Sequence, residues 1–324
     1  MALNVDFSRG SISLYEILKG ERSAPMNSSA NKNMGTALIL IAAVFWGLMG
    51  LFVRAFASHG LASSQVACLR LGVGAMIFAL VILIKDRGLF CIKLRDLPLF
   101  LALGICSLSF FTICYFKSIE MMPLSTAAIL LYTSPIWVML MSALFFKEAL
   151  TLRKLLALCM AFGGCVLVSG LSGGELSLAA LLCGLGSGLG YALYSILGTV
   201  ALRRYEPLTV TFYGFLFGSL GCLAVSGPAK LFAAVLAAPV SVMLWLIPLS
   251  ALVSAVIPYL AYTQGLKSVE AGKASIIATV EPVVATLVGI ILYREGLSLS
   301  AAVGIVLVLG AIVVLNTKKA QEYS

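Results

Sequence analysis

Residues 274–295 read ASIIATVEPVVATLVGIILYRE, and residues 127–148 read AAILLYTSPIWVMLMSALFFKE. Each stretch is apolar, has a proline at its ninth position (Pro282 or Pro135) and ends in a glutamate. The phrase Lys-Ser-aliphatic-Glu precedes both stretches, at residues 267–270 and 117–120. Composition and spacing therefore recur together, with the two prolines 147 residues apart. The sequence indicates an internal duplication of an apolar unit, which is how many secondary transporters are built.

The composition requires lipid as the surrounding solvent. Hydrophobic residues make up 61% of the 324 residues and charged residues only 11%, whereas an ordinary soluble domain has about 25% charged residues. The net charge is +9. The basic residues are scattered between apolar runs and form no stripe with aromatic residues, so we expect no nucleic-acid partner. They are better interpreted as topology signals.

The sequence lacks the motifs of several kinds of metal, redox and catalytic site. The eight cysteines include no CxxC pair, and His59 is the single histidine. We therefore expect no disulfide framework and no metal site. No Walker motif, HExxH or GxSxG is present, so we expect no cofactor, no ATP hydrolysis and no hydrolase centre.

A membrane span needs about 20 largely apolar residues. This length predicts an all-α integral membrane protein with ten spans. They lie near residues 35–57, 64–84, 97–116, 124–146, 152–170, 177–201, 207–226, 242–264, 274–293 and 298–316. The predicted organisation is a flexible cytoplasmic tail (1–34), a first five-helix repeat (35–170), a second five-helix repeat (171–317) and a cytoplasmic tail (318–324).

The positive-inside rule sets the orientation. With the N-terminus inside, 17 basic residues fall on the cytoplasmic side and four on the outer side, and Arg70 lies within a span. Both termini are then cytoplasmic, in a multi-pass membrane protein. Because each repeat has an odd number of spans, the second repeat is inverted relative to the first. Inverted repeats can alternate between inward-open and outward-open states around a central site.

Glu281 is the leading candidate for a binding or coupling residue. Counted from Ala274, it lies about 10 Å into its span. An acid at the centre of a membrane helix costs about 2.5–3.5 kcal/mol on insertion scales, so intramembrane acids are functional candidates by default. Glu281 would bind a cationic group or accept a proton. The alternative is a carboxylate that only holds helices together. The first repeat has Ser134 at the matching position.

Three prolines predict helix breaks. Pro135 and Pro282 are matched, and paired breaks in corresponding helices point to a central cavity. Pro258 adds a third break, whose aligned position in the first repeat is Leu108. The alternative interpretation is simple helix kinks.

Other site candidates are one cation and several aromatic residues. Arg70 lies about six residues into the second span, where snorkelling to the outer interface or a structural ion pair is expected. Trp46, Tyr132 and Tyr191 fall well inside their spans, and Tyr262 lies in the eighth. These aromatic residues are candidates to line a cavity for a flat or amphipathic solute, although each alone is typical of packing.

With these residues in view, the chain resembles the EamA-type members of the drug/metabolite transporter superfamily. The resemblance covers residues 35–316 and rests on a small set of segments: Phe45-Trp46-Gly47, Arg70, Tyr132-Thr133-Ser134-Pro135, Glu148-Ala149-Leu150-Thr151, Glu281-Pro282-Val283 and Glu295-Gly296-Leu297-Ser298. It implies an inner-membrane carrier with a cavity between the repeats, commonly an exporter of amino acids or related metabolites. The implied partners are a small-molecule solute and the lipid bilayer, with a proton as the candidate coupling ion.

Three functions remain open from the sequence. The leading one is a secondary exporter of small metabolites. A second is efflux of lipophilic cations, for which Glu281 would supply the counter-charge. A third is an integral-membrane enzyme that modifies lipids, which the short loops and the single histidine oppose.

The topology is tested with reporter fusions after residue 174 and at the C-terminus. We expect a periplasmic signal from the first and a cytoplasmic signal from the second, because five spans separate the two positions. Signals from the same compartment would rule out the odd-numbered inverted repeat.

Overall fold

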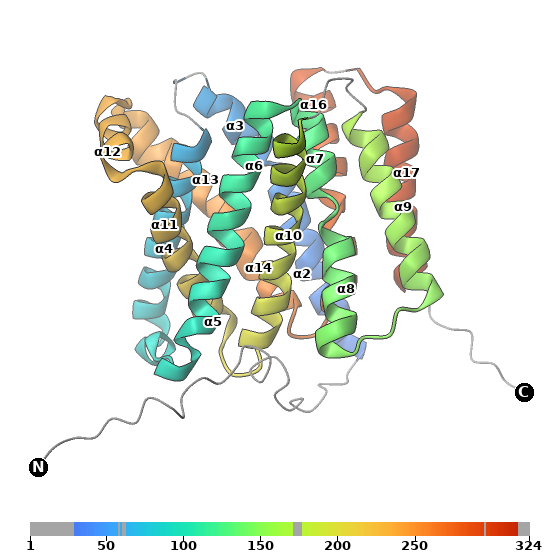
Figure 1. The fold of residues 1–324 in the computed structure, drawn as a ribbon, viewed down its shortest axis with the longest axis horizontal. Helices are drawn as coiled ribbons and strands as arrows, with labels where there is room; N and C mark the ends of the chain where they lie inside the picture. Colours follow the sequence, from blue (N-terminus) through green and yellow to red (C-terminus); the bar gives the residue numbers. More distant parts are fainter. Residues whose placement is uncertain (1–28, 58, 60–62, 171–176, 295, 317–324) are drawn as a thin grey trace, which may run out of the picture.

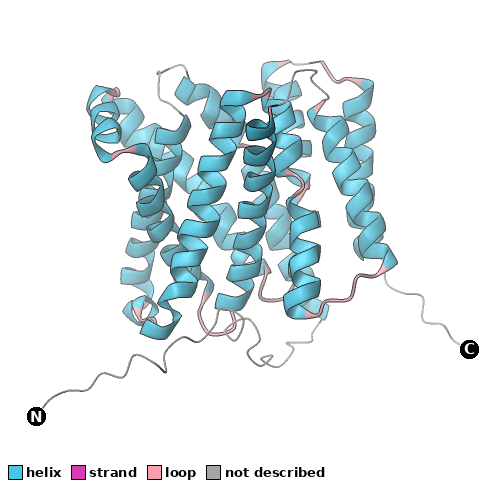
Figure 2. Ribbon diagram, in the orientation of Figure 1, coloured by secondary structure: helices cyan, strands magenta, loops and turns pink. Residues whose placement is uncertain are grey.

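The computed structural model describes residues 29–57, 59, 63–170, 177–294 and 296–316. Within those residues the chain folds into helices and contains no strand (Figure 2). Ten segments are long and apolar enough to cross a membrane, and they stand side by side in one bundle (Figure 1). The ten predicted spans are confirmed. Glu295 and most of the two predicted tails lie outside the described residues.

The first repeat supplies spans 1 to 5. Its elements are α2 (Ser29–Gly47), α3 (Met49–Ala57), α4 (Ser63–Lys85), η2 (Arg87–Phe90), η3 (Leu94–Asp96), α5 (Leu97–Leu101), the π-helical η4 (Ala102–Ser109), α6 (Phe110–Met121), α7 (Leu124–Leu131), α8 (Ser134–Phe146) and α9 (Leu152–Ser169). Span 1 is formed by α2 and α3, span 3 by η3 to α6, and span 4 by α7 and α8.

The second repeat supplies spans 6 to 10. Its elements are α10 (Leu178–Ala201), α11 (Pro207–Ser226), α12 (Pro228–Ala237), η5 (Val242–Leu246), α13 (Ile247–Ala251), η6 (Leu252–Val256), α14 (Ile257–Gly265), α15 (Ala271–Ala278), α16 (Val280–Tyr293) and α17 (Leu299–Asn316). Span 8 is formed by η5 to α14, and span 9 by α15 and α16.

The duplication seen in the sequence is reproduced in the backbone. The helices α15 and α17 begin and end 147 residues after α7 and α9. Lys147 and Arg294, at the ends of α8 and α16, both adopt the left-handed conformation, with φ of 53° and 55°. Because each repeat contains five spans, the second repeat is inverted relative to the first.

The two repeats interlock along the bundle. Corresponding helices pack against each other, α4 against α11 and α9 against α17. In addition, α2 packs against α14, α15 and α16 of the second repeat, and α10 packs in the matching way against α6, α7 and α8 of the first. A central space between the repeats is therefore bordered by spans 1, 3 and 4 and by spans 6, 8 and 9.

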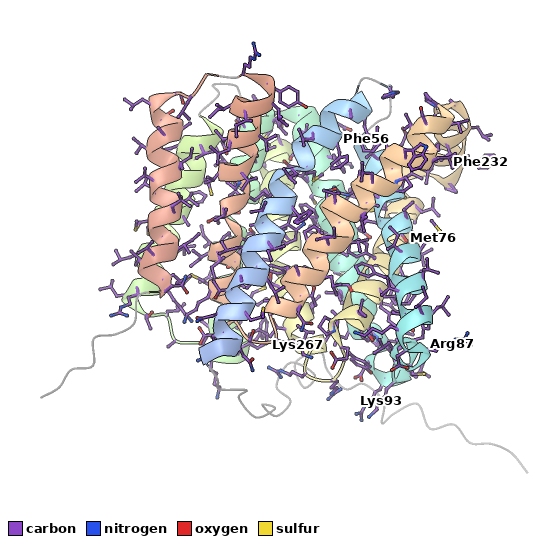
Figure 3. The ribbon with its side chains drawn as sticks, turned by 180° about the vertical axis from the view of Figure 1, so that it is seen from behind. Phe56, Met76, Arg87, Lys93, Phe232 and Lys267 are labelled. Atoms are coloured by element: carbon purple, nitrogen blue, oxygen red, sulfur yellow. The ribbon has the colours of Figure 1, made fainter. Side chains whose placement is uncertain are left out.

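The outer surface of the bundle is suited to lipid. On α4, Met76, Leu80 and Ile84 are 64%, 58% and 79% exposed, whereas Phe78 and Ile82 on the opposite face are fully buried. Figure 3 shows Met76 on the outside of the bundle. A stripe of exposed apolar residues four apart is one face of a helix, and such a face is stable only when lipid covers it.

One element was not expected from the sequence. The helix α12 has ten residues, too few to cross a bilayer. It lies at the same end of the bundle as α3 (Figure 1), and Figure 3 places Phe232 and Phe56 at that end. Phe232 and Leu236 are 65% and 71% exposed. An exposed apolar helix at the end of the bundle is typical of a segment that lies in the membrane interface.

The contact between α9 and α17 depends on glycine. A Cβ atom at Gly164 would lie 2.7 Å from the carbonyl oxygen of Gly304, and one at Gly304 would lie 2.6 Å from the carbonyl oxygen of Gly164. Small residues allow such close approach of helix backbones in lipid. The neighbouring Gly163 faces open space, with no atom within 4 Å of the position of a Cβ.

The glycine contact predicts a sharp difference between adjacent substitutions. Gly164→Ala should destabilise the protein by about 1–3 kcal/mol, because the methyl group overlaps a backbone carbonyl that cannot move freely. Gly163→Ala should leave stability unchanged or raise it, since alanine is the better helix former. The measurement is thermal unfolding of both purified variants in detergent. Equal stability of the two would contradict the described contact.

Candidate functional site

Spans 4 and 9 are both broken near their centres by proline. Pro135 and Pro282 are buried at the first turns of α8 and α16. Proline has no N–H and clashes with the carbonyl four residues earlier, so each span divides into two helices. At the breaks, the hydroxyl of Thr133 donates to the carbonyl of Leu130 and that of Thr279 donates to the carbonyl of Ile276, both at 2.6 Å.

Glu281 lies at the level of the second break, deep in the bilayer. It is ten residues after Ala271, where span 9 begins, and therefore about 15 Å from that end. The depth of about 10 Å expected from the sequence was too small, because the span begins three residues before Ala274. None of the described residues donates a hydrogen bond to its carboxylate or forms an ion pair with it.

A small cavity lies beside the Glu281 side chain. It is lined by Leu131, Tyr132, Ser134, Tyr191, Ser275, Ala278, Thr279 and Glu281. Both broken spans and span 6 contribute to this lining. Ser134, which matches Glu281 in the first repeat, therefore lies in the same cavity as Glu281. The cavity offers several hydroxyl groups and one carboxylate to a solute.

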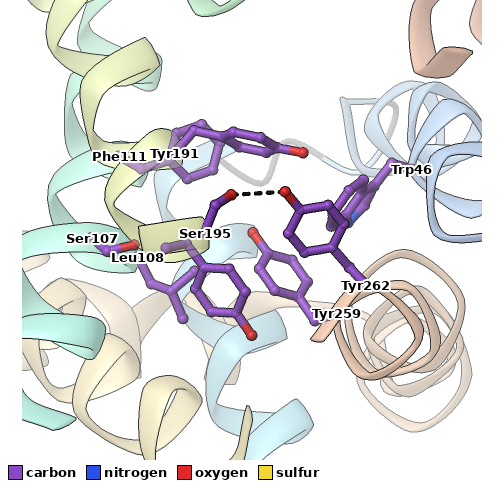
Figure 4. A pocket seen from close by; sticks show the side chains of 9 residues that line it. Trp46, Ser107, Leu108, Phe111, Tyr191, Ser195, Tyr259 and Tyr262 are labelled. Carbon is purple, nitrogen blue, oxygen red and sulfur yellow. Dashed lines mark hydrogen bonds between the residues drawn. The ribbon is translucent and has the colours of Figure 1, made fainter. Parts of the chain in front are cut away.

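A second small cavity is mainly aromatic. The ring of Trp46 contacts those of Tyr191, Tyr259 and Tyr262, with centroid distances of 5.8, 5.3 and 5.3 Å (Figure 4). The remaining lining residues are Ser107, Leu108, Phe111, Tyr194 and Ser195. Tyr191 lines both cavities, so they adjoin at this side chain. Together they form what we call the central site.

Hydrogen bonds fix several groups of the central site. The hydroxyls of Ser195 and Tyr262 are 2.7 Å apart (Figure 4), and those of Tyr194 and Thr263 are 2.8 Å apart. The buried hydroxyl of Ser107 has no hydrogen-bond partner among the described residues. A buried hydroxyl without a partner is costly in an apolar setting and is available to a solute.

The sequence predicted that Arg70 would either snorkel to the outer interface or form a structural ion pair. The structure shows neither arrangement. The guanidinium of Arg70 turns inward, where Nη1 donates to Sδ of Met49 at 3.0 Å and to Oγ of Ser254 at 3.2 Å. Its Nε is buried and without an acceptor among the described residues. The side chain is long enough to reach the outer interface, but the contacts of spans 1 and 8 hold it inside the bundle.

Span 1 is also interrupted beside the central site. The helix α2 ends at Gly47 and α3 begins at Met49, with Leu48 between them. A Cβ atom at Gly47 would lie 2.8 Å from the carbonyl oxygen of Glu281. Glycine thus allows span 1 to approach the backbone of Glu281. The sequence did not predict this interruption, because no proline marks it.

The structure brings most of the predicted site residues together. Trp46, Tyr191 and Tyr262 share the aromatic cavity, while Tyr132 and Glu281 share the polar one. Pro258 is buried at the start of α14, after the π-helical η6. The prediction missed the small polar lining residues Ser107, Ser195, Ser275 and Thr279. Ser195 follows Tyr191 by four residues, and this helical spacing was an available signal.

Ion pairs join the repeats at one end of the bundle. Nζ of Lys154 in the first repeat is 2.8 Å from the carboxylate of Glu270 in the second and 3.5 Å from that of Glu148. The carboxylate of Asp96 accepts hydrogen bonds from Arg204 and Tyr205 of the second repeat, each at 2.7 Å. Figure 3 shows Lys93 and Lys267 at this end, which the basic residues predict to be cytoplasmic.

The two glutamates around Lys154 differ in their electrostatics. Burial raises the pKa of Glu148, and Lys154 offsets this only in part. Burial also acts to raise the pKa of Glu270, but the hydrogen bond and charge of Lys154, together with the charges of Lys273 and Lys32, outweigh it, so that the pKa lies below its ordinary value. Glu270 is therefore the stronger partner of Lys154 at neutral pH.

Ten spans in two inverted repeats, with a polar site at paired helix breaks, are typical of a membrane transporter. The model of the EamA-like transporter family matches residues 33–170 and 178–317. The chain belongs to this family, which consists of transporters and not enzymes.

Relatives and a solved structure agree with this assignment. Two uncharacterized transporters of Archaeoglobus fulgidus are 27% and 30% identical over 290 and 281 residues, covering 87% and 86% of this chain and 98% and 95% of those proteins. The pseudopaline exporter CntI of Pseudomonas aeruginosa is 27% identical over 184 residues, or 55% of this chain and 61% of that protein. A crystal structure with 17% identity has a TM-score of 0.73, covers 88% of this chain and 96% of its own, and confirms the fold.

Proposed function

We propose that this transporter is a secondary exporter of amino acids or related small metabolites, working by alternating access across the inner membrane with both termini cytoplasmic. The observation that carries the proposal is Glu281, a carboxylate halfway across the bilayer that no described residue neutralises by hydrogen bond or ion pair. The name of one relative, a pseudopaline exporter, supports export as the direction.

Glu281 has two chemical roles in this proposal. A carboxylate without a partner attracts an ammonium group, and the surrounding hydroxyls can accept further hydrogen bonds from it. The same carboxylate can take up a proton when no solute is bound, so that movement of the empty carrier does not carry a bare charge through lipid. Substrate or proton gradients would drive the transport cycle.

The ion pairs at the predicted cytoplasmic end support alternating access. They tie the first repeat to the second through Lys154–Glu270 and Asp96–Arg204. The position that matches Lys154 in the other repeat is Ala301, which carries no charge. Ala301 cannot form the equivalent ion pair, and this difference supports opening of the two ends of the bundle at different times.

The pKa of Glu270 determines the pH range in which the Lys154–Glu270 ion pair holds the predicted cytoplasmic end closed. Because its pKa in the folded state is lowered, the Lys154–Glu270 pair contributes stability above the ordinary pKa of glutamate. That contribution is lost only as the pH falls through the lowered value. At neutral pH the pair favours a closed cytoplasmic end.

Efflux of lipophilic cations is the second candidate. Trp46 and the three tyrosine rings in contact with it are suited to a flat cation, and Glu281 would supply its counter-charge. This candidate assigns no role to Arg70. Modification of lipids is no longer a candidate, because the family consists of transporters.

The test of the proposal is Glu281→Gln. This change keeps the shape and removes the charge, so transport should fall about tenfold or more, which corresponds to about 1.4 kcal/mol. Expression in the membrane should stay near that of the wild type, because an amide costs less in lipid than an ion. Transport is measured in vesicles, normalised to folded protein, from mildly acidic to mildly alkaline pH. The solute for this assay is identified by comparing the metabolite profiles of cells that lack the protein with those of cells that overproduce it.

Glu120→Gln is the matched control, since Glu120 is an exposed glutamate near the end of α6. It should transport normally. A Glu281→Gln variant with normal transport and the pH profile of the wild type would remove Glu281 from binding and coupling.

A further inference from the structure

Lys154 is a buried cation with two carboxylate partners. It lies in the first turn of α9, and only 8% of its side chain is exposed. Its Nζ is 2.8 Å from Oε2 of Glu270 and 3.5 Å from Oε2 of Glu148. A buried ammonium group is strongly unfavourable without a partner. The arrangement of these two carboxylates therefore contributes to the free energy of separating the repeats at this end.

The two carboxylates differ in how the chain attaches them to Lys154. Glu148 belongs to the same repeat and lies six residues before Lys154. Its backbone N–H donates to the carbonyl of Ser142 in α8, and the N–H of Lys154 donates to the hydroxyl of Thr151. The local backbone thus keeps Glu148 beside Lys154. Glu270 precedes α15 of the second repeat, so it moves away from Lys154 when α15 separates from α9.

Glu270 does not depend on Lys154 for its charge. Its side chain is 51% exposed, so water can solvate the carboxylate. The charges of Lys273 in α15 and Lys32 in α2 also favour its ionised form. Glu270 can therefore leave Lys154 without becoming a buried charge that has no partner.

Glu148 and Glu270 compete for the same ammonium group. Burial is the main cause that raises the pKa of Glu148, and the negative charge of Glu270 adds to it. Repulsion between the two carboxylates opposes closure, and it ends when Glu270 departs. Glu148 also lies against the first turn of α15. A Cβ atom at Gly272 would be 3.2 Å from its Oε2, and the backbone N–H of Gly272 favours the ionised carboxylate.

We propose that Glu148 is a positioning residue that makes closure of the predicted cytoplasmic end reversible. Lys154 exchanges Glu270 for Glu148 when this end opens, and it returns to Glu270 when the end closes. Glu148 acts through Lys154 and does not touch the solute. The inference rests on the alternating access of the proposed function and deepens it by naming the residue that releases the closure. It does not depend on which solute is carried.

The test measures how readily the cavity of Glu281 is reached from the cytoplasmic side. The reporter is Ser134→Cys in the full-length protein without its eight native cysteines. A membrane-impermeant thiol reagent labels it in inside-out vesicles, and rates are normalised to folded protein. Glu270→Gln should raise the labelling rate about fivefold, because the closure is lost. Glu148→Gln should lower it about fivefold, because Glu270 is then the only carboxylate on Lys154.

Further variants show whether Glu148 acts by competition. Glu148→Asp keeps the carboxylate and should bring the labelling rate back toward that of the reporter alone. In a Glu270→Gln background, Glu148→Gln should no longer lower the rate, because Lys154 has no second carboxylate to exchange. Glu206→Gln is the matched control. Glu206 pairs with Lys267 inside the second repeat and is 60% exposed, so its loss should leave the labelling rate unchanged.

Three results would overturn the inference. Glu148→Gln could raise the labelling rate as Glu270→Gln does, which would make Glu148 a second lock. It could leave the rate unchanged, or it could lower the rate equally in the Glu270→Gln background. Failure of the proposed function gives a different result, because labelling at equal rates from both sides of the membrane in every variant would contradict alternating access itself.

Discussion

The bilayer cannot solvate a charge or an unpaired backbone group, and this constraint organises the whole chain. Helices satisfy their own backbone, so ten of them form the bundle. Where proline interrupts spans 4 and 9, threonine hydroxyls bond to nearby carbonyls. The uncompensated groups are then concentrated between the repeats, where Glu281 and Arg70 lie on either side of the interruption in span 1. In the proposed function, a solute in the central site takes the role of the missing partners.

The two repeats have similar helix boundaries and helix breaks, but their charged side chains differ. Helix boundaries, central breaks and left-handed helix ends recur at a spacing of 147 residues. The charged groups do not recur, since Glu281 matches Ser134 and Lys154 matches Ala301. Symmetric breaks allow either end of the bundle to open. The charges of Glu281 and Lys154 therefore belong to one repeat each, and among the described residues the pair Lys154–Glu270 joins the repeats at the end that the basic residues predict to be cytoplasmic.

The spans and the paired breaks were predictable because apolar length and proline act locally. Trp46, Tyr191 and Tyr262 were also identified, since aromatic residues deep in a span are conspicuous. The inward turn of Arg70 was not predictable, because it depends on Met49 and Ser254 in two other spans. The interruption at Leu48 has no proline to mark it, and its position follows from close packing of Gly47 on span 9. The helix α12 is too short to give a hydropathy signal of a span.

The central claim is that one site between inverted repeats opens to one side of the membrane at a time. The most direct measurement uses Ser134→Cys, in the cavity of Glu281, after replacement of the eight native cysteines. A membrane-impermeant thiol reagent is applied to right-side-out and inside-out vesicles, with Lys154 intact or changed to methionine. The account predicts faster labelling from the outer side while Lys154 is present, and a shift toward labelling from the cytoplasmic side in Lys154→Met. Labelling from neither side, or rates that do not respond to Lys154→Met, would contradict it.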